Sequence, residues 1–332
     1  MQRRETAPYP CSGIDISSSS ICSHEYVFFL DVKPPDAYRY SQVAHRLFTM
    51  AQNSSIEWTD HTFNPWWGCS KVSPACDNCY AELWAKRMGH QVWGVTADRR
   101  FFSDSHWNEP LTWNEDARTT RKRKRVFCAS MADVFERRAE LNSERVRLWR
   151  LIEQTPWLDW LLLTKRPQNI ARMVPWEHAW PQNVWLGTTV ESQVFAEKRL
   201  PYLLQNAAVV RFLSCEPLLG PLDLNTWFRR TGFHTIDWVI AGGESGPKSR
   251  PMHPDWAIGL LDQCTKEAVP FHFKQWGHWA PVELAGEDIL PRFITLPHER
   301  PVQMVPLGKK AAGRRLEGAT WNGLPRRTLA NA

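Results

Sequence analysis

Three cysteines with the spacing C-x6-C-x2-C lie in the stretch NPWWGCSKVSPACDNCYAE, residues 64–82. They are Cys69, Cys76 and Cys79, and the same stretch carries Trp66, Trp67 and Tyr80. Thiolates are soft ligands, and several of them converging from one loop are typical of a transition-metal site. Three thiolates match three irons of a [4Fe–4S] cube, which leaves the fourth iron open for a substrate or cosubstrate.

Two other interpretations of the three thiols stay open. Zinc in a structural site usually has four ligands, often from two C-x-x-C pairs, and this chain has one such pair. His61 or His90 would then have to supply the fourth ligand. The third interpretation is that the thiols are small buried side chains, a role that suits Cys128 and Cys215 better because both lie in predicted strands.

The last two cysteines of the motif precede a predicted helix that ends near Gly89. Asp77 or Asn78 is the predicted N-cap of this helix. A thiolate at a helix N-terminus is stabilised by the helix dipole and by free N–H groups. The local sequence therefore favours deprotonated cysteines.

The composition of the 332-residue chain is that of a soluble globular protein, with 43% hydrophobic and 23% charged residues. Apolar runs are short and the N-terminus has no apolar signal region, so we expect a cytoplasmic protein without a membrane span. The chain has eight cysteines, but only the three near residue 70 are clustered. In a reducing compartment such a cluster indicates a metal site rather than disulfide bonds. Residues 1–50 are Ser-rich and unpatterned, which predicts a loosely packed extension before a single domain at 51–332.

From about residue 56 a unit repeats in which a short apolar run ends in a polar residue, and amphipathic stretches lie between the runs. The runs are 124–133, 160–167, 183–192, 209–217, 237–246 and 269–277. Residues 141–154 and 253–268 have apolar side chains at helical spacing. Apolar strands alternating with helices predict a parallel α/β sheet. About seven strands at this spacing favour a TIM-like (βα) barrel, complete or partial.

Charged residues stand at the C-terminal ends of all six predicted strands: Asp133, Lys165, Arg166, Glu191, Glu216, Glu244 and Lys274. In a βα barrel these ends line the active-site mouth. We therefore predict a polar cleft, with Glu191, Glu216 and Lys274 as candidate acid–base residues. Lys165 and Arg166 are candidate cofactor contacts because of the same strand-end position.

Several motifs together resemble the phage gp thirty-seven / gp sixty-eight family of largely uncharacterised proteins. They include IEWTDHTFNPWWGCSKVSPACDNCYAE, LTKRP, VWLGTTVE, SCEPLLGP, AGGESGPKSRPMHPDW and GKKAAGRRLEGATWNGLP. The resemblance covers about residues 54–325. The family is similar to radical S-adenosylmethionine (SAM) enzymes, which have a TIM-like barrel and a three-cysteine motif.

The resemblance implies that Cys69, Cys76 and Cys79 hold a [4Fe–4S] cluster whose open iron binds SAM. Reductive cleavage of SAM would then release a radical that abstracts hydrogen from a substrate. The GGE segment, Gly242, Gly243 and Glu244, resembles the motif that contacts the methionine amino group in such enzymes. The two glycines would let a ligand approach the backbone closely.

The net charge of +6, the RKRKR run at 121–125 and the GKKAAGRR tail at 308–315 are compatible with a nucleic acid or nucleotide partner. We weigh three functions. The first is a radical SAM enzyme acting on a nucleobase or nucleoside, which needs an electron donor. The second is a non-catalytic iron–sulfur or zinc protein that binds nucleic acid. The third is an acid–base barrel enzyme whose thiols are structural.

Overall fold

The computed structural model describes residue 54 and residues 56–177, 179–228, 235–246, 248–286 and 293–325. The chain divides into two units, Met1–Ala44 and His45–Ala332, and every described residue belongs to the second. The predicted extension at 1–50 lies outside the described residues.

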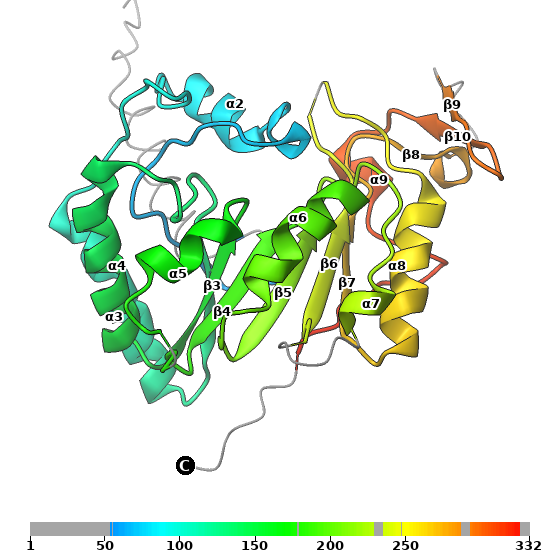
Figure 1. Ribbon diagram of the computed structural model, residues 1–332. Helices are drawn as coiled ribbons and strands as arrows, with labels where there is room; N and C mark the ends of the chain where they lie inside the picture. The colour runs from blue at the N-terminus through cyan, green and yellow to red at the C-terminus, as the bar shows by residue number, and fades with distance from the viewer. Residues whose placement is uncertain are drawn as a thin grey trace, which may run out of the picture. The chain divides into compact units, whose positions relative to one another are not determined.

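Seven parallel strands form one curled sheet in which every strand pairs with its neighbours in sequence (Figure 1). They are β1 (His61–Thr62), β2 (Lys124–Cys128), β3 (Leu158–Thr164), β4 (Val184–Thr189), β5 (Val210–Cys215), β6 (Trp238–Gly242) and β7 (Phe271–Gln275). All six predicted runs are strands, and β1 is the additional one. The predicted parallel (βα) architecture is confirmed.

The sheet is a partial rather than a complete barrel. Its order runs from β1 to β7, and no pairing joins these two edge strands within the described residues. The C-terminal segment covers the β7 edge, because Phe273 N–H donates to Trp321 O at 3.0 Å and Gly323 N–H donates to Phe271 O at 2.8 Å. The open edge of a parallel sheet is thereby hydrogen-bonded rather than exposed.

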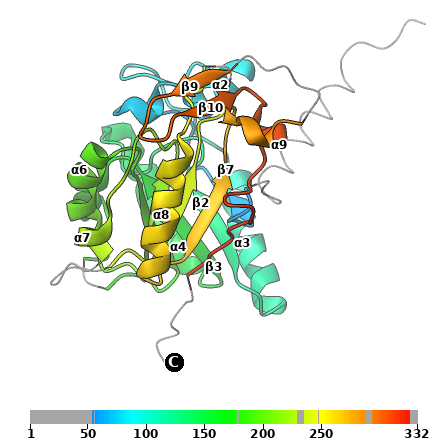
Figure 2. The same ribbon diagram turned by 90° about the vertical axis from the view of Figure 1, so that its right-hand side faces the viewer.

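Helices pack against the outer face of the curved sheet, as Figures 1 and 2 show for α4, α6 and α8. The longer helices are α3 (Asp104–Thr119), α4 (Asn142–Gln154), α6 (Gln193–Leu203) and α8 (Pro254–Lys266). Shorter ones are α2 (Tyr80–Arg87), α5 (Ile170–Met173), α7 (Asn225–Phe228) and α9 (Lys309–Ala312). The two amphipathic helices predicted at 141–154 and 253–268 are confirmed as α4 and α8. None of the helices within the described residues is long and apolar enough to cross a membrane.

Alternate residues of each strand point to opposite faces of the sheet. Leu162 belongs to the large core that includes Leu148 of α4, whereas its neighbour Leu161 packs with Trp185 and Trp238 in a separate inner cluster. Each of these side chains is at most 4% exposed. Because both faces are buried, the strands read as nearly continuous apolar runs.

A small antiparallel sheet follows β7, with the strand order β8 (Ala280–Pro281), β10 (Val302–Val305), β9 (Ile294–Leu296). In Figure 2 this sheet lies at the same end of the parallel sheet as α2. This sheet could not be predicted from the sequence, because strands of two to four residues contain too few positions to show a periodic pattern.

Candidate active site

The segment 64–79, here called the cysteine loop, is attached to the C-terminal edge of the parallel sheet. Asn64 Oδ1 accepts from Met131 N–H at 2.7 Å, and Gly68 N–H donates to Met131 O at 3.0 Å. Gly68 has φ +116°, and a Cβ there would lie 2.3 Å from Val92 O. Only glycine therefore allows the chain to turn into the first cysteine.

Arg166 binds the start of the cysteine loop with its whole guanidinium group. Nη1 lies 3.5 Å from Cys69 Sγ and 2.9 Å from Asp133 Oδ2, and Nη2 donates to Ser70 O at 2.8 Å. Ser70 Oγ donates in turn to Glu136 at 2.7 Å. These buried groups connect the ends of β2 and β3 to the first cysteine.

Within this network Arg166 stabilises the Cys69 thiolate, whereas the two carboxylates disfavour it. Burial raises the pKa of Cys69 to about 12, with further increases from Asp133 and Glu136, while Arg166 lowers it. Burial also acts to raise the pKa of Asp133, but Arg166 and three hydrogen bonds more than offset it and hold that pKa below its usual value. Without a metal, Cys69 is thus a thiol at neutral pH.

Cys76 ends a 3-10 turn at Pro74–Cys76, and Cys79 is the N-cap of α2. The prediction that Asp77 or Asn78 caps this helix was wrong, because both side chains are used elsewhere. Burial raises the pKa of Cys79, whereas the N–H groups of Glu82 and Ala81 and the charge of Lys165 lower it. Burial prevails, so the pKa of Cys79 lies above its usual value even though the helix start acts to stabilise the thiolate.

Two consecutive cations after β3 face the two ends of the cysteine motif. Arg166 contacts Cys69, while Lys165 lowers the pKa of Cys79. A charged Cys76 would also raise the pKa of Cys79. The fold therefore places Cys69 at the end of β3, in contact with Arg166. Lys165 Nζ has no hydrogen bond or ion pair with any described residue, so it can bind a ligand.

The far side of the cysteine loop is held by the segment after β6. Asn78 Nδ2 donates to Glu244 Oε2 at 2.9 Å, and Arg250 pairs with Glu244 at 2.5 Å while donating to Pro74 O at 2.8 Å. Asp77 lies 3.4 Å from Arg250. Burial favours the neutral form of Glu244, but the bonds from Arg250 and Asn78 prevail and lower its pKa. Glu244 thus carries a negative charge that orders the loop.

The predicted residues at the ends of β5 and β7 meet on the inner face of the sheet. Lys274 Nζ is 2.7 Å from Glu216 Oε2, and Gln275 Nε2 donates to Glu216 Oε1 at 2.9 Å. A β-bulge between β6 and β7, where Gly242 pairs with Gln275, lets consecutive residues reach the same carboxylate. The Lys274 and Glu216 side chains keep 14% and 17% of their surface exposed, so the pair borders the mouth.

Glu191 is placed differently from Glu216. Its carboxylate pairs with Arg199 of α6 at 2.6 Å, and its side chain is 1% exposed. Gly243 allows a close approach of backbones, since a Cβ there would lie 1.9 Å from Trp276 O. Gly242 lies beside Glu216, because a Cβ placed on Gly242 would be 3.5 Å from the Glu216 side chain.

The three aromatic residues of the motif have separate environments. Trp66 is fully buried in the main core, and Trp67 packs against Trp84 and under the Arg100 guanidinium at 4.5 Å. Tyr80 is 56% exposed, and its hydroxyl donates to Ser130 O at 2.9 Å. Of the three, Tyr80 is the one that a ligand at the mouth can reach.

Much of the basic sequence is used inside the fold. Arg123 pairs with Asp159 at 2.7 Å, and Arg125 lies 3.4 Å from Asp60. Arg314 donates to Phe273 O at 3.3 Å. The RKRKR run and the tail thus contribute fewer free cations than their composition indicates.

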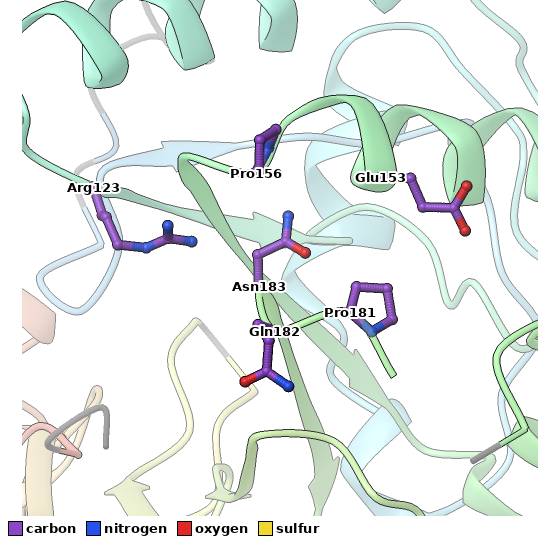
Figure 3. A pocket seen from close by; sticks show the side chains of 6 residues that line it. All are labelled: Arg123, Glu153, Pro156, Pro181, Gln182 and Asn183. Carbon is purple, nitrogen blue, oxygen red and sulfur yellow. The ribbon is translucent and has the colours of Figure 1, made fainter. Parts of the chain in front are cut away.

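A hollow of about 450 Å³ lies at the opposite, N-terminal edge of the sheet (Figure 3). It is lined by Arg123, Glu153, Pro156, Pro181, Gln182 and Asn183. Asn183 Nδ2 donates to the backbone of Ile152 at 3.0 Å, and Arg123 is ion-paired. The polar groups of this hollow stabilise the fold, and no thiol lies in it.

Several residues that position the site have no local sequence signal. They are Arg99, Glu136 and Arg250; Arg99 and Glu136 are 37 positions apart, and Arg250 and Pro74 are 176 positions apart. Arg99 donates to Glu136 at 2.8 Å with a fully buried guanidinium group. Charged residues are common in surface loops, so nothing in the local sequence distinguishes these three.

A family model described as "Protein of unknown function (DUF5131)" matches residues 53–325. No curated protein matches the chain. Three solved structures of spore photoproduct lyase are similar in fold. The one with bound AdoMet and dinucleoside spore photoproduct has 10% identity and a TM-score of 0.41, covering 78% of this chain and 72% of the other. A mutant of that lyase has 11% identity and a TM-score of 0.41, with 76% and 70% covered.

Proposed function

Because the chain belongs to the DUF5131 family, whose description assigns no function, we propose one from the site itself: an iron–sulfur enzyme of the radical SAM type that acts on a nucleobase or nucleoside. Cys69, Cys76 and Cys79 would hold the cluster. The observation that supports the proposal is the contact of Cys69 with Arg166 at the C-terminal edge of a partial βα barrel, where the charge of Lys165 also acts on Cys79.

The donor set suits an iron–sulfur cluster better than zinc. Within the described residues, no group of three ligand atoms lying within 4.8 Å of one another includes the motif thiols. A single tetrahedral zinc with Zn–S bonds of about 2.3 Å holds its sulfurs about 3.8 Å apart. A cube binds each thiolate to a different iron, which permits the wider spacing, and the nearby cations offset its thiolate charge.

A reduced cluster with bound SAM supplies one-electron reductive cleavage and hydrogen abstraction. The protein's own residues would bind and orient. Lys165 has a free ammonium group beside Cys79 for a ligand carboxylate. Both carboxylate oxygens of Glu244 are already bound by Arg250 and Asn78, so an ammonium group of a cosubstrate would have to share them. We therefore assign Glu244 chiefly to ordering the cysteine loop.

The substrate class follows from the chemistry of the mouth. Tyr80 offers a half-exposed aromatic ring on which a base can stack. Glu216 and Lys274, joined at 2.7 Å, offer donors and acceptors for a base edge from the facing strands. The acid–base alternative loses one of its candidate residues, because the Glu191 carboxylate is 1% exposed and pairs with Arg199.

The proposal is tested by purifying the full chain without oxygen and measuring iron, sulfide and 5′-deoxyadenosine formed from SAM under reduction. We expect about four irons per chain, lost in Cys76→Ala and retained in the control Cys264→Ala, whose thiol is buried in α8. Zinc at one equivalent without sulfide would refute the cluster. A cluster without SAM cleavage would leave the non-catalytic nucleic-acid-binding function, for which salt-dependent DNA binding is the assay.

A further inference from the structure

A second group of metal-binding side chains lies away from the cysteine loop. His253 and Asp255 stand at the start of α8, and His298 lies in the turn between β9 and β10. One ligand atom from each of the three falls within 4.8 Å of the other two. Two segments more than forty positions apart are therefore brought to one point by the fold.

The separations approach those of ligands on one ion. His298 Nδ1 is 3.3 Å and His253 Nδ1 4.0 Å from Asp255 Oδ2. Metal bonds of about 2.0–2.1 Å in a tetrahedral site place ligand atoms about 3.3–3.4 Å apart. The first distance already fits, and the second requires a small movement of one ring.

Two of the three candidate ligands, His253 and Asp255, also hydrogen-bond to a neighbouring group that orients them, as ligands in metal sites usually do. His253 Nε2 lies 3.1 Å from Arg300 O, which fixes its proton there and leaves the lone pair on Nδ1. Arg300 Nη2 donates to Asp255 Oδ1 at 3.0 Å, so Oδ2 remains free to bind. The Nδ1 lone pair now accepts a long bond of 3.2 Å from Asp255 N–H, which an ion would replace.

Burial leaves one side of the group open. The His253 side chain is fully buried, whereas Asp255 and His298 are 20% and 32% exposed. An ion can enter from solvent, and water can complete its coordination. The N-terminus of α8 disfavours a cation, and the Asp255 carboxylate offsets this effect.

We propose that His253, Asp255 and His298 bind a divalent transition-metal ion of the zinc class, which joins the β9–β10 turn to the start of α8. Imidazole and carboxylate ligands suit zinc, cobalt and nickel. The proposal concerns a structural site and does not depend on the chemistry of the cysteine loop.

Cobalt(II) titration of the full chain, followed by absorption spectroscopy, tests the site. Cobalt bound to thiolates gives sulfur charge-transfer bands in the near ultraviolet, whereas cobalt on nitrogen and oxygen ligands gives visible bands alone. We expect one equivalent of the second kind. His298→Ala should weaken it at least about tenfold, and the control His278→Ala should leave it unchanged.

A zinc-dependent rise in melting temperature that His298→Ala abolishes would agree with this result. Because His298 lies at the surface, we expect His298→Ala to keep its fold, and far-ultraviolet circular dichroism checks this. Equal binding of the nitrogen–oxygen type in wild type and His298→Ala, or no such binding in either, would overturn the proposal. The three residues would then be an ion-pair cluster that caps α8.

Discussion

Replacing Arg166 by methionine is the most direct test of how the fold supports the cysteine loop. The Arg166 side chain is 7% exposed and binds Asp133 at 2.9 Å, Ser70 O at 2.8 Å and Cys69 Sγ at 3.5 Å. Removing one partner of a buried ion pair costs about 3–5 kcal/mol. Asp133 keeps the bond from Thr164 Oγ1 and two backbone N–H bonds, so we expect about 3 kcal/mol at neutral pH.

The loss should depend on pH in a defined direction. Arg166 holds the pKa of Asp133 below its usual value, so this stabilisation is present above the unfolded-state pKa and is lost as the pH falls through the folded-state pKa. In Arg166→Met the carboxyl group takes up its proton at higher pH. The difference in unfolding free energy between wild type and variant should therefore shrink as the pH falls from about 4, the unfolded-state value, through the lower folded-state pKa of Asp133.

Urea unfolding of the apo protein at several pH values measures this difference, with the exposed Arg172→Met as the control. Alkylation of Cys69 gives a second readout, since loss of the cation raises the pKa of that thiol further and should slow its reaction with iodoacetamide. A loss below about 1 kcal/mol that is the same at every pH would refute the reasoning, because Arg166 would then behave as a surface charge.

Three further predictions concern other contacts of the same fold. Arg250→Met removes the contacts that hold the far side of the cysteine loop. Because the Arg250 side chain is one-third exposed, we expect a loss of only about 1 kcal/mol in the free energy of unfolding. We also expect the variant to retain less iron than the wild type after gel filtration. His272 is buried, and desolvation is the main cause that lowers its pKa to about 4. Its neutral form therefore stabilises the folded protein fully above the unfolded-state pKa. Up to about 3 kcal/mol of the free energy of unfolding is lost as the pH falls from about 6.5 to about 4. His272→Gln should flatten urea midpoints across that window, and an unchanged pH profile would contradict this. Gly243→Ala places a Cβ 1.9 Å from Trp276 O and should lower the melting temperature by several degrees, about 2 kcal/mol or more, whereas Gly259→Ala, with open space around it, should not.

The parallel α/β architecture could be predicted from the sequence alone because the strands are buried on both faces. Such strands appear as uninterrupted apolar runs, and the helices between them show apolar faces at helical spacing. The six runs and the helices at 141–154 and 253–268 were predicted on this basis. Closure of the barrel could not be predicted, because whether β7 pairs with β1 depends on curvature summed over the whole sheet.

The sequence also identified the candidate ligands, since three thiols in residues 69–79 are a local feature. Tertiary structure decided their surroundings. Whether Glu244 faces a ligand or Arg250, and whether Arg166 contacts a cofactor or Cys69, depends on side chains brought together from distant segments. Such contacts leave no period or spacing in the chain. They exist because burying a charge is unfavourable unless the fold supplies a partner.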